Sequence, residues 1–115
     1  METIEQAKVR FGALIEAQKE RVAAMRSQGD FIDYEKLPQI VIGVCGGDGI
    51  GPTITHEAER VLRFLLQDEV TGGKVAFKEI DGLTIENRAA CMKAIPDDVM
   101  EELKACHVIL KGPTT

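Results

Sequence analysis

Gly46-Gly47-Asp48-Gly49-Ile50-Gly51-Pro52 is the stretch that decides how this chain folds, because it separates two runs of different period. Residues 39–45, just before it, are almost entirely apolar, which is typical of a strand buried on both faces. After it, apolar residues recur at three- and four-residue steps, which is typical of a helix. The stretch is therefore predicted to be a strand-to-helix turn.

The composition of this turn favours contact with a ligand. Four glycines in six residues allow positive φ angles and the close approach of another group. Pro52 suits the first helical position, where no N–H is needed. The free N–H groups of that turn and the positive end of the helix dipole favour an anion or a polar ligand. This loop is the best candidate for a ligand-contacting segment.

Two common nucleotide-binding motifs do not fit the loop. Gly46 and Gly51 have the spacing of a P-loop, but Pro52 replaces the lysine that would reach the phosphates. A Rossmann fingerprint would need a third glycine, and Asp81 lies farther on than the usual roughly 20 residues. A purely structural turn would not need four glycines, each of which costs up to about 1 kcal/mol where it is not required.

Composition and charge restrict the class of protein. The 115 residues suit one domain, and 44% apolar with 29% charged residues is ordinary for a globular protein. The net charge of −5, with no dense basic block, argues against nucleic acid or an anionic membrane as partner.

No run approaches the roughly 20 apolar residues of a membrane span, and no signal-peptide core is present, so we expect a cytoplasmic protein. The three cysteines have no metal-ligand spacing and are expected to be reduced: Cys45, Cys91 and Cys106.

Residues 1–38 are predicted to be an N-terminal helix and connector, separate from the domain at 39–115. Apolar residues at helical spacing predict one long amphipathic helix over residues 2–28, with Gly29 as its C-terminal cap. The connector, 30–38, contains Phe31, Ile32 and Tyr34 and is too apolar for a free linker, so we expect it to be pinned to a surface. The apolar residues of the helix are Ile4, Ala7, Phe11, Leu14, Ile15, Val22 and Met25.

Residues 39–115 alternate strands with helices, which predicts an α/β domain. Strands are expected at 39–45, 75–80 and 108–110, and helices at 53–67, 85–93 and 96–105. Connections that carry helices imply parallel strands joined by crossovers. The helix at 96–105 should bury Val99, Met100 and Leu103, whereas Arg88 should be exposed. His56 is expected at the surface or in a cap, and His107 has no visible partner.

Two motifs in this order resemble the N-terminal part of the isocitrate and isopropylmalate dehydrogenase family, the metal-dependent β-decarboxylating dehydrogenases. The first is 47–52, and the second is Leu110-Lys111-Gly112-Pro113-Thr114-Thr115. The intervening segments 81–88 and 95–98 fit the same pattern. The resemblance covers residues 39–115 and leaves the long N-terminal helix as an extension.

This resemblance implies an NAD(P)-dependent oxidoreductase with an isopropylmalate dehydrogenase-like fold that works as a homodimer. The substrate would be a hydroxy-dicarboxylic or hydroxy-tricarboxylic acid such as 3-isopropylmalate or isocitrate. Hydride would pass to NAD or NADP and carbon dioxide would leave, assisted by Mg²⁺ or Mn²⁺. The resemblance assigns Gly49, Ile50, Gly51, Thr114 and Thr115 to the cofactor, and Lys111 and Thr115 to the edge of the substrate pocket.

The family's catalytic and metal-binding residues belong to segments of its pattern beyond position 115. Tyr34, in the connector, cannot replace the catalytic tyrosine, and Asp97 and Asp98 are better explained as helix-dipole residues than as metal ligands. We therefore expect no catalytic residue or metal ligand here, and no dehydrogenase activity from these 115 residues alone. Two other classes stay open: a non-catalytic α/β nucleotide-binding module, and an assembly module that uses residues 2–28.

Overall fold

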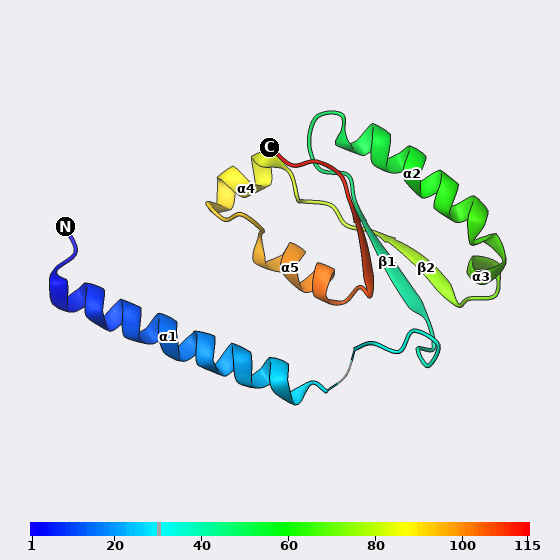
Figure 1. Cartoon of the computed structure of the whole chain (residues 1–115). Helices are drawn as coiled ribbons and strands as arrows, with labels where there is room; N and C mark the ends of the chain where they lie inside the picture. The colour runs from blue at the N-terminus through cyan, green and yellow to red at the C-terminus, as the bar shows by residue number, and fades with distance from the viewer. Residues whose placement is uncertain (30) are drawn as a thin grey trace. The chain divides into compact units, whose positions relative to one another are not determined.

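The computed structural model describes residues 1–29 and 31–115, which divide into two units, Met1–Asp33 and Tyr34–Thr115 (Figure 1). Asp30, where the expected connector begins, lies outside the described residues. The second unit begins at Tyr34, so residues 34–38, which the sequence assigned to the connector, belong with the α/β domain.

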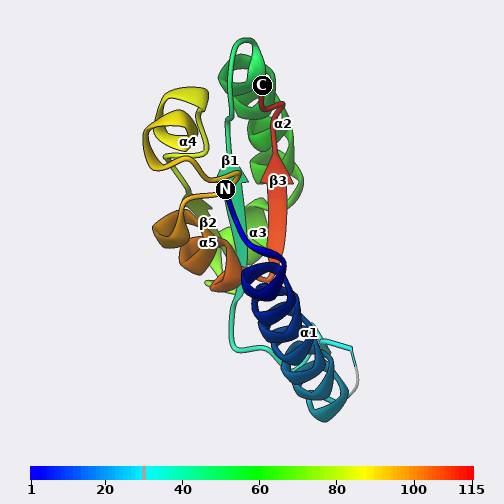
Figure 2. The same cartoon turned by 90° about the vertical axis from the view of Figure 1, so that its left-hand side faces the viewer.

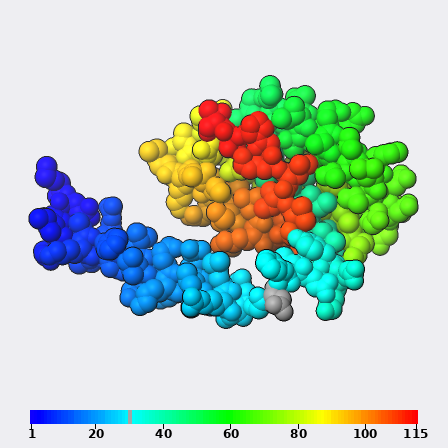
Figure 3. Space-filling view, in the orientation of Figure 1, coloured from blue at the N-terminus to red at the C-terminus, as the bar shows by residue number. Residues whose placement is uncertain are grey.

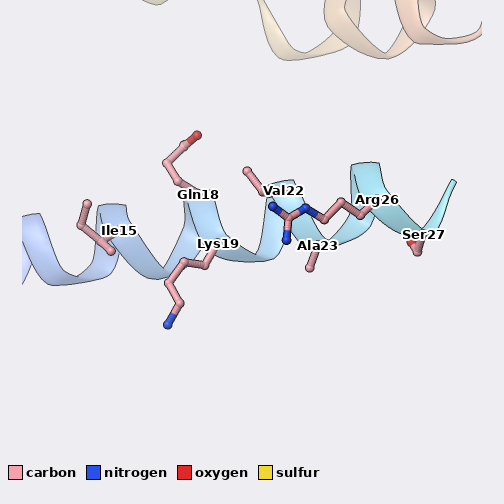
Figure 4. A pocket seen from close by; sticks show the side chains of 7 residues that line it. All are labelled: Ile15, Gln18, Lys19, Val22, Ala23, Arg26 and Ser27. Carbon is pink, nitrogen blue, oxygen red and sulfur yellow. The ribbon is translucent and has the colours of Figure 1, made fainter. Parts of the chain in front are cut away.

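The first unit contains one long helix, α1, Ile4–Ser27. Thr3 caps it: its hydroxyl oxygen accepts a hydrogen bond from the N–H of Gln6, whose side-chain oxygen accepts one from the N–H of Thr3. Gly29, just beyond the helix, has a φ of +76°, as expected of a C-terminal cap. No residue of α1 is buried, and Figure 4 shows seven of its side chains projecting from its second half. The predicted helix is confirmed, and its apolar side chains are exposed.

Residues 34–37 are tied to the base of the sheet by hydrogen bonds, whereas the apolar side chains expected to pin the connector are exposed: Phe31 to 102%, Ile32 to 53% and Tyr34 to 42%. The Lys74 ammonium donates to the carbonyl oxygens of Glu35 and Leu37, at 3.1 and 2.6 Å. The Tyr34 hydroxyl donates to the carbonyl oxygen of His107 at 3.4 Å. These bonds fix the path by which the chain enters its first strand.

The sheet has three parallel strands in the order β2-β1-β3. They are β1, Ile40–Cys45, β2, Val75–Glu79, and β3, Val108–Lys111. Ile42 lies opposite Phe77 on β2 and Val108 on β3. The parallel sheet and the central position of the strand before the glycine loop are confirmed.

Helices cover both faces of this sheet, with α2 and α3 on one side and α4 and α5 on the other (Figures 1 and 2). The helix expected at 53–67 is two helices, α2, Gly51–Leu65, and α3, Gln67–Thr71. The others are α4, Ile85–Cys91, and α5, Asp97–Lys104. Pro52 is the second residue of α2 rather than its first, and Pro96 is the N-cap of α5.

The core lies between β1 and the segment that carries α4 and α5. Cys45, Ile80 and Val99 form its centre and are at most 2% exposed. Burial raises the pKa of the Cys45 thiol, and the neighbouring Cys106 raises it further, so Cys45 is held in the neutral form. All three cysteines are free, as expected.

The outer side of α2 carries exposed apolar residues. Ile54, Val61 and Leu65, which recur at helical spacing, are 50%, 59% and 67% exposed. The helix is buried only through Gly51 and Thr55, which are small. The apolar stripe is wider than the area that the sheet covers, and spacing alone does not show which part of a stripe is covered.

Candidate functional site

The two motif segments meet where β1 and β3 end. The N–H of Gly112 donates to the carbonyl oxygen of Cys45 at 2.7 Å, and the N–H of Asp48 donates to the carbonyl oxygen of Pro113 at 2.8 Å. Figure 3 shows the C-terminal residues, in red, at the surface between the segment that follows β1 and the segment around α4. Because the strands are parallel, their carboxyl ends bring the glycine loop and residues 112–115 to one edge of the sheet.

Glycine is required at the contact between these segments. Gly47 has a φ of +77°, and a Cβ added to it would lie 2.0 Å from the carbonyl oxygen of Pro113. Gly51, a predicted cofactor residue, is buried, and a Cβ there would lie 2.2 Å from the carbonyl oxygen of Gly46. Gly51 therefore contributes through the path of the backbone.

The outer part of the loop is open. Gly49 has a φ of +57°, and a Cβ built on it would meet nothing within 4 Å. Ile50 follows it with its side chain 71% exposed. A flat group can therefore approach the backbone at Gly49 and contact the Ile50 side chain.

The start of α2 offers fewer free donors than the sequence suggested. The N–H of Gly51 already donates to the carbonyl oxygen of Asp48 at 2.8 Å, and Pro52 has no N–H. Phosphate-binding helix starts use several unpaired N–H groups. The loop therefore suits contact with a ring or a sugar better than a phosphate cradle.

Asp48 was not singled out from the sequence, yet its carboxylate connects three segments. Oδ1 accepts from the N–H of Ile85 at 2.8 Å, and Oδ2 accepts from the N–H of Thr115 at 2.9 Å. The bonds from Thr115 and Ile85 hold the pKa of Asp48 below its ordinary value, with smaller contributions from the positive charges of Arg88 and Lys111. The sequence feature that could have pointed to Asp48 is its position between two glycines, because Asp side chains in turns often hydrogen-bond nearby backbone groups.

Arg88 is the second residue that sequence reasoning missed, and its expected exposure is wrong. Its side chain is 24% exposed because the guanidinium folds back over the site. Nε donates to the carbonyl oxygen of Ala94 at 2.9 Å, and Nη1 donates to the carbonyl oxygen of Thr115. The same Nη1 lies 4.0 Å from Oδ2 of Asp48.

The predicted residues at the end of β3 and just after it make two sets of contacts. The Lys111 ammonium donates to the carbonyl oxygen of Gly112 at 3.0 Å and to the Thr114 hydroxyl at 3.1 Å. Thr115 is held instead by Asp48 and Arg88. A positive charge and two hydroxyl groups are thus presented beside the glycine loop.

The two histidines lie away from these residues. His56 is exposed on α2. His107 does have a partner, contrary to expectation: its Nδ1 accepts from the N–H of Val41 at 3.0 Å, and its own N–H donates to the carbonyl oxygen of Val41 at 2.9 Å. Through these two bonds, His107 extends the β1–β3 pairing by one residue.

Metal ligands are not assembled in residues 1–29 and 31–115: no three His, Cys, Asp or Glu side chains are grouped so that they could hold an ion. Asp97 and Asp98 lie in the first turn of α5, and Asp97 pairs with Lys93. Within the same residues, no helix has both the length and the apolar character needed to cross a membrane.

Comparison with known proteins gives two relatives. The chain is 33% identical over 75 residues to 3-isopropylmalate dehydrogenase 1 of Bradyrhizobium diazoefficiens, which covers 65% of this chain and 19% of the relative. It is 32% identical over 87 residues to the isocitrate dehydrogenase (NADP) of Caldococcus noboribetus, which covers 66% of this chain and 18% of the relative. No model of a protein family matches, and no solved structure matches.

The chain therefore spans less than a fifth of the length of these relatives. Both are dehydrogenases, so the relationship that the two motifs predicted is confirmed at the level of the oxidoreductase class. Over about two thirds of its length, this chain is related to the isopropylmalate and isocitrate dehydrogenases.

Proposed function

We propose that residues 46–52 and 111–115 form the cofactor side of an NAD(P)-dependent dehydrogenase that oxidises and decarboxylates a 2-hydroxy acid. The observation that carries this proposal is the meeting of the two motif segments through the Asp48–Pro113 and Gly112–Cys45 hydrogen bonds. The fold would be isopropylmalate dehydrogenase-like, and the whole protein would work as a homodimer.

The loop fits the cofactor at its open part. The space beside Gly49 and the exposed Ile50 side chain suit the adenosine end of the dinucleotide. The hydroxyl groups of Thr114 and Thr115 can hydrogen-bond an amide or a carboxylate without adding charge. NAD or NADP, when bound, accepts the hydride from the substrate carbon.

Lys111 gives this surface its preference for acids. Its ammonium lies against the Thr114 hydroxyl, at the edge that a hydroxy-dicarboxylic or hydroxy-tricarboxylic acid would approach. A positive charge there attracts the substrate carboxylates. The described residues do not fit Mg²⁺ or Mn²⁺, so they are assigned binding and orientation, and no metal-dependent step.

Fluorescence titration with NADH and NADPH tests the proposal. We expect saturable enhancement of the nicotinamide fluorescence, and we expect Ile50→Asp to weaken it. Val61→Asp is the matched control, because Val61 is similarly exposed but lies in α2, away from the loop. Absence of binding, or equal effects of the two substitutions, would contradict the proposal.

Assembly through α1 is the competing function, and the exposure of all its residues favours it. The two functions separate experimentally at Phe11, which is 64% exposed. Phe11→Glu should change the molecular mass measured by sedimentation equilibrium if α1 assembles the protein. It should leave dinucleotide binding unchanged if the loop binds the cofactor.

A further inference from the structure

Asp48 holds together three segments that are distant in the sequence. Its N–H donates to the carbonyl oxygen of Pro113, and its two carboxylate oxygens accept from Ile85, in the first turn of α4, and from Thr115. The side chain is 10% exposed. One residue of the glycine loop thus fixes both the start of α4 and the end of the second motif.

Thr115 is held at both its N–H and its carbonyl oxygen. Asp48 accepts from its N–H, and Arg88 donates to its carbonyl oxygen. Arg88 is itself anchored, because its Nε donates to the carbonyl oxygen of Ala94. Asp48 and Arg88 together leave this backbone little freedom to rotate.

The charges around Asp48 favour its ionised form. The positive groups that face it are Arg88 on α4 and Lys111 at the end of β3. Hydrogen bonds to an ionised acceptor are roughly twice as strong as those between neutral groups. Asparagine at this position would keep only one acceptor oxygen. Its NH₂ group would take the place of the second oxygen and would face a backbone N–H that needs an acceptor.

We propose that Asp48 is a positioning residue that, with Arg88, holds residues 113–115 and the start of α4 against the glycine loop, so that the cofactor-contacting backbone is formed before the cofactor arrives. This inference rests on the proposed function. Pre-formed backbone lowers the cost of ordering the site on binding. Asp48 touches neither cofactor nor substrate in this role and acts through Thr115.

The first test needs no cofactor. We expect the amide proton shifts of Ile85 and Thr115, followed by NMR from pH 7 to pH 2, to titrate with one common midpoint below the ordinary Asp value of about 3.9. In Asp48→Asn this shared titration should disappear, whereas the control Asp98→Asn, at an exposed helix position, should retain it. Two unrelated midpoints, or none, would overturn the proposal.

The second test measures NADH affinity together with the melting temperature. Asp48→Asn should weaken binding about tenfold, as expected for disturbing charge-assisted hydrogen bonds, and Asp48→Glu should restore part of the loss. A lower melting temperature with affinity within twofold of the parent would reduce Asp48 to a structural residue and overturn the proposal. If the parent protein shows the shared amide titration but binds no NADH or NADPH, the positioning by Asp48 stands and the proposed function fails.

Discussion

The α-carbon of Gly47 faces the carbonyl oxygen of Pro113 so closely that a Cβ on Gly47 would lie 2.0 Å from that oxygen. The next residue, Asp48, donates its N–H to the same oxygen. The contact between the two motif segments therefore depends on a position that has no side chain. A larger residue would have to push residues 112–115 away from the loop.

Gly47→Ala should lower the free energy of unfolding by about 2 kcal/mol or more, because a positive φ costs an L-residue roughly 1–2 kcal/mol and the clash adds to it. Gly73→Ala is the matched control: Gly73 has the same φ, +77°, but a Cβ there would meet nothing within 4 Å. Urea denaturation of both variants measures the difference. Equal losses would show that Pro113 moves aside without cost.

His107→Ala should destabilise the second unit, because the N–H of Val41 would lose the Nδ1 acceptor in a half-buried place. A buried donor left without a partner costs about 1–3 kcal/mol. His56→Ala, at an exposed position of α2, should change stability by no more than about 0.5 kcal/mol. Thermal or urea unfolding decides between these values, and a neutral His107→Ala would mean that water replaces the ring.

Met92→Gly should stabilise the chain. Met92 ends α4 with φ 53° and ψ 36°, a left-handed conformation that costs an L-residue roughly 1–2 kcal/mol. Its side chain is 89% exposed, so removing it sacrifices little packing. Glycine is the usual residue at such a helix end, and we expect a gain of about 1 kcal/mol. Met92→Ala, which keeps the Cβ, should give none of this gain.

The sequence predicted the backbone better than the side chains. Periodicity identified the strands and the helices, and the helical connections predicted parallel pairing, because these depend on local pattern and chain length. The partner of His107, the folded-back Arg88 and the role of Asp48 depend on residues brought close by the fold, which spacing does not encode. Of the site, the glycine loop and Lys111 were identifiable because motifs carry them.

Asp48 should make the stability of the second unit depend on pH in a defined direction. Hydrogen bonds from Thr115 and Ile85 lower its pKa in the folded protein, so it stabilises the fold at pH values above its unfolded pKa of about 3.9. That stabilisation is lost as the pH falls through the lower, folded pKa. The difference in urea midpoint between the parent and Asp48→Asn should therefore be largest at pH 7 and shrink steadily below pH of about 4. A difference that stays constant from pH 7 to pH 2 would show that the charge of Asp48 contributes nothing, and that only the shape of its side chain holds the two motif segments together.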